Sequence, residues 1–310
     1  MKGLPLKKGP KEFYKIYSLI LFSIFLVLFS LSIILKFWII NYSTNDIPIK
    51  PRADFKYPVL KAEFNPQISA TGAIIMDGKT KALIYSKNPK LRFSPASTTK
   101  IMTAIVALDS FKLNDILTVK EATTEGSILG LYPGEQLSLE SLLYALLLPS
   151  ANDAALTIAQ NYPGGEKKFI DKMNEKAKLF MLENTHFGDP AGLEDSKNFT
   201  TPFDLARLAS FAMENSDFAK IVSTQYKIIT DMSGASVYFL ENLNKLLGTD
   251  NITGIKTGYT QEAGQVLVIS KVESGNTIIL VVMGSEDRFL DTQKLLSLIS
   301  GNLTYLSIHP

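Results

Sequence analysis

The stretch SPASTTKIMTAIVAL, residues 94–108, decides how the rest of the chain is interpreted. From Ile101 to Leu108 it is apolar on every side of a helix, and a helix without a polar face belongs in the middle of a domain. Ser94 suits the N-cap, and Pro95 suits the first helical position because its missing N–H costs nothing there. We therefore expect a buried central helix that begins at this proline.

The first turn of this expected helix carries a serine and a lysine three residues apart, Ser97 and Lys100. At this spacing the two side chains lie on the same face, close enough to hydrogen-bond. The serine N–H belongs to the unpaired donors at the positive end of the helix, where an oxyanion is stabilised. The pattern indicates a nucleophile with its base, and the competing interpretation is a capped core helix with an ordinary lysine.

Composition excludes several classes of function. The 310 residues carry a net charge of +2. Residues 1–40 hold six lysines and one glutamate, so the remainder is at −3. A nearly neutral body without a long basic run argues against nucleic acid as the main partner. The chain has no cysteine, which excludes disulfides and zinc–thiolate sites. It has only two histidines, too few to favour a histidine metal cluster or a Ser-His-Asp triad. We expect no cofactor and no metal.

The N-terminal region has the pattern of a membrane anchor. Residues 16–35 form an uncharged run of 20 residues, the length of a bilayer-spanning helix, and five lysines precede it. Positive flanks remain inside, so residues 1–15 are expected in the cytoplasm and the body outside, with the lipid bilayer as partner of residues 16–35. A cleaved signal peptide is the alternative, but the run is long and no small-x-small site follows it.

The remaining chain divides into a linker, residues 36–66, and one domain, residues 67–310. Two short strands at 73–77 and 82–86 form a hairpin before the central helix. Helical patterns follow at 137–148, 152–160, 166–184 and from Thr201, and two β-branched strands at 264–272 and 277–283 precede a closing helix at 287–299. Strands at both ends with helices between them predict an α+β fold, an antiparallel sheet flanked by helices with a helical insertion.

Two further motifs carry polar groups suited to catalysis. Lys256-Thr257-Gly258 occurs once in the chain, and its bland interpretation is an exposed strand lysine beside a turn glycine. Ser-x-Asn occurs six times, of which Ser150 and Ser196 lie between the other motifs. Ser150 follows a proline in a tight turn between two apolar helices, whereas Ser196 lies in a polar stretch typical of a surface loop. We select Ser150-Ala151-Asn152, for which a helix-capping serine is the alternative.

In this order and spacing, the three motifs resemble the penicillin-recognising serine acyltransferases. Within them the match is to the D-alanyl-D-alanine carboxypeptidases, the low-molecular-mass penicillin-binding proteins, and it extends from about Ile68 to Leu296. It also includes flanking pieces at 189–193, 204–206 and 242–244. The resemblance implies a DD-peptidase/β-lactamase-like fold, a peptidoglycan stem peptide ending in D-Ala-D-Ala as substrate and β-lactam antibiotics as inhibitors.

The resemblance also implies catalytic roles. Ser97 attacks the carbonyl of the penultimate D-alanine and forms an acyl-enzyme. Lys100 is its base, and burial beside the second cation, Lys256, lowers the lysine pKa in the direction that this role needs. Ser150 relays the proton to the leaving amine.

Substrate-binding roles follow from the same resemblance. Lys256 and Thr257 hold the terminal carboxylate. Gly258 lets a strand approach the substrate closely, and the N–H groups of Ser97 and Tyr259 form the oxyanion hole. Asn152 contacts the substrate amide and orients the lysines.

Two departures from the family pattern bear on substrate presentation rather than on chemistry. Ala151 stands where many members have glycine. The chain ends soon after the last helix, without the second β-domain and C-terminal anchor of many members, and the N-terminal span could replace that anchor.

Three other functions remain open at this point. A D,D-endopeptidase shares every motif. A β-lactamase would need a deacylating glutamate, and no segment identifies Glu166, Glu183 or Glu194 as one. A non-catalytic wall-binding protein of the same fold is disfavoured by the presence of both the serine and the lysine.

Overall fold

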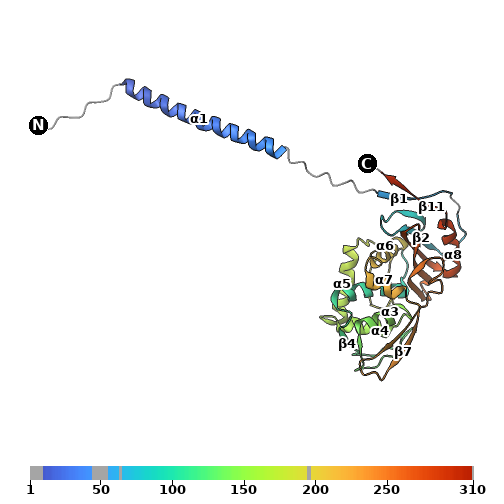
Figure 1. Cartoon of the computed structure of the whole chain (residues 1–310). Coiled ribbons are helices and arrows are strands. Elements are labelled where there is room, and N and C mark those ends of the chain that lie inside the picture. The colour runs from blue at the N-terminus through green and yellow to red at the C-terminus, as the bar shows by residue number, and fades with distance from the viewer. Residues whose placement is uncertain (1–9, 44–54, 63–64, 194–196, 309–310) are drawn as a thin grey trace. The chain divides into compact units, whose positions relative to one another are not determined.

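The computed structural model describes residues 10–43, 55–62, 65–193 and 197–308. They form two separate units, an N-terminal helix, α1 (Pro10–Ser43), and a body, Phe55–Ile308 (Figure 1). Tyr14–Trp38 of α1 is long and apolar enough to cross a membrane, with a mean hydropathy of 2.8 and every described side chain exposed. A signal sequence would pass the same test, so the helix leaves both interpretations of the N-terminus open.

The body is built on one antiparallel sheet of five strands in the order β3-β2-β10-β9-β8. The bounds of these strands are β2 Gly72–Asp77, β3 Leu83–Lys87, β8 Ile252–Thr260, β9 Gly264–Glu273 and β10 Asn276–Ser285. β2 and β3 come before the helical segments in sequence and the other three after them. The predicted antiparallel sheet with a helical insertion is confirmed, and β8 is one of its two edges.

The sheet is buried on both faces. Successive side chains of a strand point to opposite faces, and alternate residues of β2 belong to two different cores. On β2, Ile74 and Met76 join the large core shared with the helical insertion, whereas Ala73 and Ile75 join a second core under α8 (Arg288–Ile299). The helices of the insertion are α2 Lys100–Ser110, α3 Leu139–Leu147, α4 Asn152–Asn161, α5 Gly165–Leu179, α6 Pro202–Ala212 and α7 Ser216–Val222. The sheet therefore separates α8 from the other helices of the body (Figure 1).

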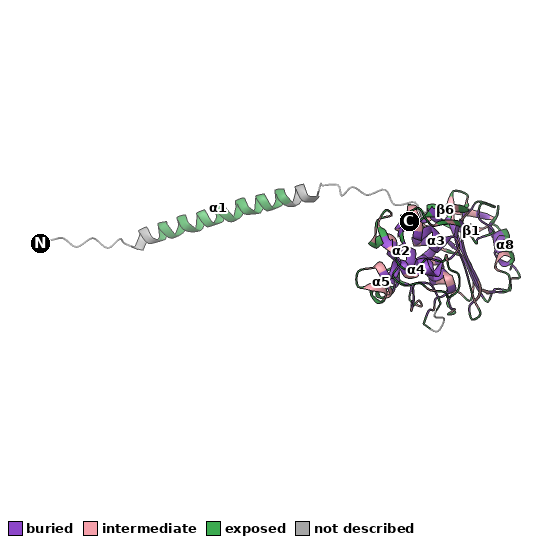
Figure 2. Ribbon diagram, turned by 90° about the horizontal axis from the view of Figure 1, so that it is seen from below, coloured by how far each residue is buried: buried purple, intermediate pink, exposed green. Residues whose placement is uncertain are grey.

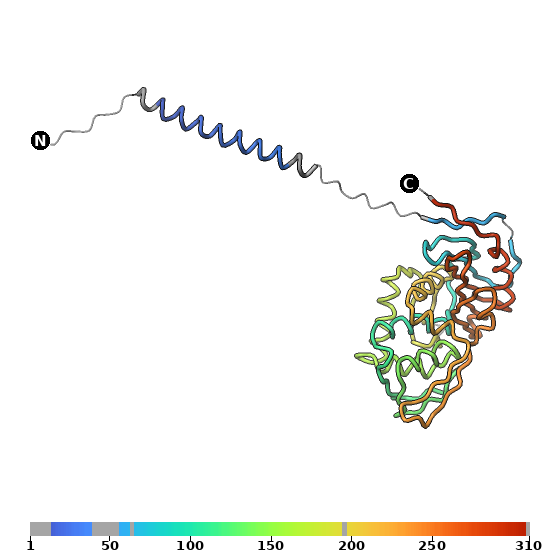
Figure 3. Tube along the Cα trace, viewed as in Figure 1, coloured from blue at the N-terminus to red at the C-terminus, as the bar shows by residue number. Residues whose placement is uncertain are grey.

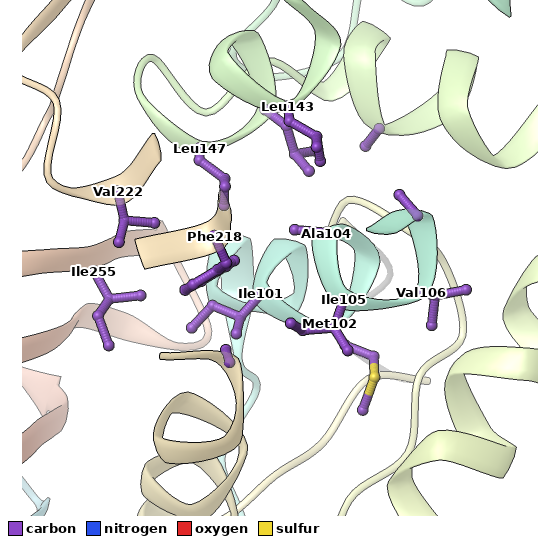
Figure 4. Packing of buried hydrophobic residues seen from close by; sticks show 14 of the residues in the cluster. Ile101, Met102, Ala104, Ile105, Val106, Leu143, Leu147, Phe218, Val222 and Ile255 are labelled. Atoms are coloured by element: carbon purple, nitrogen blue, oxygen red, sulfur yellow. The ribbon is translucent and has the colours of Figure 1, made fainter. Parts of the chain in front are cut away.

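The apolar helix that the sequence places at the centre does lie there. The side chains of α2 from Ile101 to Val106 are almost completely buried, and Figure 2 shows α2 and its neighbours α3 and α4 mostly in the buried colour. Leucines of α3, Phe218 of α7 and Ile255 of β8 surround it (Figure 4). This packing fixes the helix end that carries the serine and the lysine.

The start of this helix differs from the prediction. Ala96–Thr99 form a short 3₁₀ helix, η1, and α2 begins only at Lys100. Pro95, not Ser94, is the N-cap of η1, and Ser94 Oγ accepts a long hydrogen bond from the Ala96 N–H at 3.4 Å. Ala96 adopts a left-handed φ of +47°, which prevents a regular helix from starting at the proline. Ser97 and Lys100 nevertheless stay one turn apart.

Two of the predicted helices begin at side-chain caps, within two residues of the expected positions. Ser138 and Thr201 accept hydrogen bonds from the N–H groups of Ser141 and Asp204 at the starts of α3 and α6. The amphipathic helix predicted to end at Asn184 ends earlier, at Leu179. The short strands β4 Ile116–Thr118, β5 Gln136–Ser138, β6 Tyr226–Thr230 and β7 Val237–Glu241 were not predicted.

The stretch 36–66 is not a plain linker as the sequence suggested. α1 continues to Ser43, and β1 (Phe55–Leu60) pairs antiparallel with β11 (Leu303–Ile308). Figure 3 shows the two strands side by side, in light blue and red. Each strand needs a partner almost 250 residues away, a contact that local sequence pattern does not reveal.

Candidate functional site

Ser97 and Lys100 meet at the junction between η1 and α2. Lys100 Nζ lies 3.1 Å from Ser97 Oγ and donates to the Ala191 carbonyl at 2.7 Å. The lysine is completely buried. The predicted pairing of the two residues is therefore present, and a backbone carbonyl from a distant loop is the second partner of the amine.

The environment of Lys100 favours its neutral form. Burial lowers its pKa to about 7, against the opposing attraction of Asp189 and Asp153. Among the described residues no carboxylate lies within 4 Å of its Nζ to form an ion pair. A lysine that is half neutral near pH 7 can accept the proton of a neighbouring hydroxyl.

Lys256 lies on β8 and is also buried, so it is not the exposed strand lysine of the bland interpretation. Burial and the charges of Lys100 and Arg288 lower its pKa well below the ordinary value. Gly258 brings this strand against η1, because a Cβ at its position would lie 3.3 Å from the Ser97 nitrogen. The strand backbone thus runs directly beside the serine.

Ser150 and Asn152 lie in the turn between α3 and α4. Ala151, not Ser150, occupies the N-cap of α4, so the capping role for Ser150 does not apply. Ser150 adopts a left-handed φ of +70°, a strained conformation for a residue with a side chain. Its Oγ and the Oδ1 of Asn152 are buried without a protein hydrogen-bond partner in the described part of the chain. Two such atoms in one turn are available to a ligand.

The structure also locates the other predicted site residues. Thr257 is buried next to Lys256, whose Nζ donates to its carbonyl at 3.1 Å. Tyr259 follows on β8 with its side chain 64% exposed. Ser196, the alternative serine of the Ser-x-Asn pattern, lies outside the described residues.

Arg288, at the start of α8, is a site residue that the sequence analysis missed. Its Nη1 donates to the Gly258 carbonyl at 2.9 Å, and its Nε is buried without a partner among the described residues. Its charge also acts on Lys256. The only available signal was an arginine directly after the N-cap Asp287, a common surface pattern.

Within the described residues, no group of three or more His, Asp or Glu side chains gathers in a way that could hold a metal ion. The contacts bring together the Ser97 hydroxyl, two lysines and an arginine, and the turn between α3 and α4 carries a second buried hydroxyl and a buried amide. This set suits nucleophilic attack on a carbonyl next to an anion.

Comparison with known proteins identifies the family. The sequence profile of the D-alanyl-D-alanine carboxypeptidases matches residues 60–287. The chain belongs to this family of serine peptidases. It is 35% identical to the D-alanyl-D-alanine carboxypeptidase of Streptomyces sp. (strain K15), over 71% of this chain and 82% of the relative.

Other relatives differ in how much of their length is matched. The chain is 31% identical to D-alanyl-D-alanine carboxypeptidase DacF of Bacillus subtilis, over 70% of this chain but only 57% of DacF. It is 33% identical to the D-alanyl-D-alanine endopeptidase of Escherichia coli, over 80% of this chain and 83% of that protein.

Solved structures confirm the fold class. The crystal structure of the Streptomyces K15 DD-transpeptidase superposes with a TM-score of 0.72 at 34% identity, over 76% of this chain and 98% of that one. The body therefore has the fold of the DD-peptidases and penicillin-binding proteins, as the resemblance implied.

Proposed function

We propose that this protein is a serine D-alanyl-D-alanine carboxypeptidase that removes the terminal D-alanine from peptidoglycan stem peptides through an acyl-enzyme. The observation that carries the proposal is the contact between Ser97 Oγ and the buried Lys100 Nζ at 3.1 Å. An amine with a pKa of about 7 is an effective base near neutral pH, and a serine needs such a base to become a nucleophile.

In the first step, Lys100 takes the hydroxyl proton while Ser97 Oγ bonds to the carbonyl carbon of the penultimate D-alanine. The N–H groups of Ser97 and Tyr259 stabilise the oxyanion. The tetrahedral intermediate then loses the D-alanine amine, which receives its proton through Ser150. Water hydrolyses the resulting ester and restores Ser97. The buried, unpartnered Ser150 Oγ supports this relay.

The terminal carboxylate of the substrate is held by positively charged side chains. Lys256 and Thr257 face it from β8, and Arg288 contributes a second positive charge beside the strand. Two close cations favour an anionic ligand, because the carboxylate relieves their mutual repulsion. Asn152, with its unpartnered Oδ1, binds the substrate amide.

The test uses a β-lactam, whose ring amide occupies the place of the scissile bond. Incubation of the full-length protein in detergent should add the mass of the drug to the peptide containing Ser97, and the adduct should be absent in Ser97→Ala. The tethered leaving group blocks water, so the adduct should persist for minutes. Rapid turnover without adduct would indicate a β-lactamase. No adduct and no hydrolysis by folded protein would leave a binding protein.

A D,D-endopeptidase is the second candidate, because the chain matches 83% of the Escherichia coli endopeptidase, about the same share as the 82% of the Streptomyces carboxypeptidase. Endopeptidase and carboxypeptidase differ in whether the leaving amine belongs to a cross-linked peptide or to free D-alanine. Parallel digestion of a pentapeptide and a cross-linked dimer separates them. Faster release from the dimer would replace the first proposal.

We further propose that α1 anchors the body outside the cytoplasmic membrane in a single pass. The lysine-rich flank before the span and the span itself support this topology. Protease added to intact spheroplasts should digest the body. Protection of the body, or a mature N-terminus beyond Leu35, would exclude an external, uncleaved anchor.

A further inference from the structure

The loop from Asp189 to Leu193 supplies the carbonyl that binds Lys100, and one carboxylate organises this loop. Asp189 Oδ1 accepts the N–H groups of Ala191 and Gly192 at 2.7 and 2.6 Å, and the Leu193 N–H lies 3.1 and 3.2 Å from its two oxygens. The carboxylate is 8% exposed. Three consecutive N–H groups therefore converge on a buried anion, which fixes the direction of the carbonyls between them.

Those carbonyls face the catalytic helix. Pro190 O accepts from Thr103 Oγ1 at 2.6 Å, and Ala191 O accepts from Lys100 Nζ at 2.7 Å, one helical turn apart on α2. Gly192, with φ +82°, packs so closely on Ala96 that a Cβ would overlap the Ala96 carbonyl. The loop is thus pressed against the segment that carries both Ser97 and its base.

A carbonyl at this position controls the orientation of the amine. Neutral lysine has two N–H donors and one lone pair, and a carbonyl oxygen can only accept. One N–H of Lys100 donates to Ala191 O, and the other partner of Nζ is Ser97 Oγ. The lone pair of the amine can then accept the hydroxyl proton of Ser97. We propose that Asp189 is a positioning residue for acylation, which holds the Ala191 carbonyl against Lys100 and thereby directs the lone pair of the amine toward Ser97.

The charge of Asp189 acts on the same amine. Asp189 from the loop and Asp153 from α4 raise the pKa of Lys100 against the stronger effect of burial, and Lys256 on β8 is the facing cation, with Arg288 beyond it. Loss of the Asp189 charge should lower the lysine pKa further. The base would then be neutral at lower pH but also weaker.

The inference rests on the proposed function, and the test measures the second-order rate of β-lactam acylation between pH 5 and 9 in the full-length protein in detergent. For Asp189→Asn, we expect the maximal rate to fall roughly 10- to 100-fold, because the base is misaligned. The midpoint of the rise in rate should move to lower pH. Asp189→Glu keeps the charge but displaces the N–H groups, so its rate should fall while its midpoint stays close to wild type.

Asp204→Asn is the matched control. This carboxylate is also buried, 3% exposed against 8% for Asp189, and it accepts hydrogen bonds from Asn184 N and Thr185 Oγ1. It is not among the charges that shift the pKa of Lys100. It should lower the melting temperature and leave the pH midpoint unchanged.

The outcomes separate the inference from the proposed function. Equal midpoints and rates in Asp189→Asn and wild type would overturn the inference, as would a midpoint shift of the same size in Asp204→Asn. If Asp189→Asn does not fold, a wild-type rate in Asp189→Glu would also overturn it. Absence of a Ser97 adduct in the wild-type protein would instead reject the proposed function.

Discussion

Two regions of the body each bury a lysine, and they differ in what surrounds the ammonium group. Lys100 at the site and Lys271 on β9 are 0% and 1% exposed. Lys271 Nζ has carboxylate oxygens of Asp250 and Glu273 at 2.7 and 3.3 Å and also donates to the Asp250 carbonyl. Lys100 has a hydroxyl and a carbonyl instead.

Burial alone therefore does not make a lysine a base. The buried ammonium of Lys271 has two carboxylates whose charges compensate its own. A buried amine whose contacts are neutral loses its proton readily, and the carboxylates that act on Lys100, Asp189 and Asp153, are engaged by backbone N–H groups. The distinction between a structural and a catalytic lysine lies in the direct partners of Nζ.

Arginine substitution should separate the two regions most strongly. Lys100→Arg keeps the charge but cannot be deprotonated, so β-lactam acylation should fall by roughly 10³-fold or more. Lys271→Arg retains a cation for two carboxylates and should acylate within about twofold of wild type. Intact-mass spectrometry over time gives both rates. Similar acylation rates in the two variants would show that the different partners of Lys100 and Lys271 do not distinguish a catalytic lysine from a structural one.

The next effect concerns Lys256, the other lysine of the site without an ion-pair partner among the described residues. Lys256→Arg keeps a cation for the substrate carboxylate but changes its geometry, so kcat/KM on a pentapeptide should fall roughly 10- to 30-fold, about 1.4–2 kcal/mol. Steady-state release of D-alanine measures this. A loss as large as that of Lys100→Arg would argue against separate roles for the two lysines.

Local pattern was sufficient for the parts of the molecule that depend on neighbours in sequence. Ser97 and Lys100 are one turn apart, and the cap of Ser138 is a local hydrogen bond, so both were predictable. The left-handed φ of Ala96 was not predictable, because it occurs where two distant segments, β8 and the loop at Gly192, pack closely on η1.

The parts that were missed depend on contacts between distant segments. Arg288 reaches Gly258 across 30 residues, and the Ala191 carbonyl reaches Lys100 across 91. β1 and β11 show strand structure only because they pair with each other. The motifs thus predicted that Ser97 and Lys100 lie together, and the fold supplies the carbonyl that binds the lysine amine.

The pH dependence of acylation should reveal the base. Because the pKa of Lys100 is lowered to about 7 and the neutral amine is the active form, the rate should rise roughly tenfold from pH 6 to pH 8 and then level off. Lys271→Met should show the same midpoint, since its site takes no part in the reaction. A flat profile, or a midpoint that moves in Lys271→Met, would assign the titration to another group.

The smallest expected effect is on stability, and it should have opposite signs in the two regions. Burial lowers the pKa of Lys100 from 10.5 to about 7, so the unfolded chain binds this proton more tightly than the folded one. The resulting penalty on folding is complete below pH 7 and disappears as the pH rises through 10.5. Lys100→Met removes it and should raise the free energy of unfolding at pH 7 by about 1–2 kcal/mol.

Lys271→Met should instead lower the free energy of unfolding by about 1–2 kcal/mol, because Asp250 and Glu273 lose their common cation. The loss stays below that of a fully buried pair, since Asp250 is half-exposed and water screens it. Urea unfolding of both full-length variants in mild detergent at pH 7 and pH 10.5 provides the measurement. At the higher pH the gain from Lys100→Met should shrink toward that of a simple apolar substitution. If Lys100→Met instead lowers the free energy of unfolding at pH 7, the charge of Lys100 is compensated by its surroundings, as that of Lys271 is. Burial of this lysine would then carry no folding penalty.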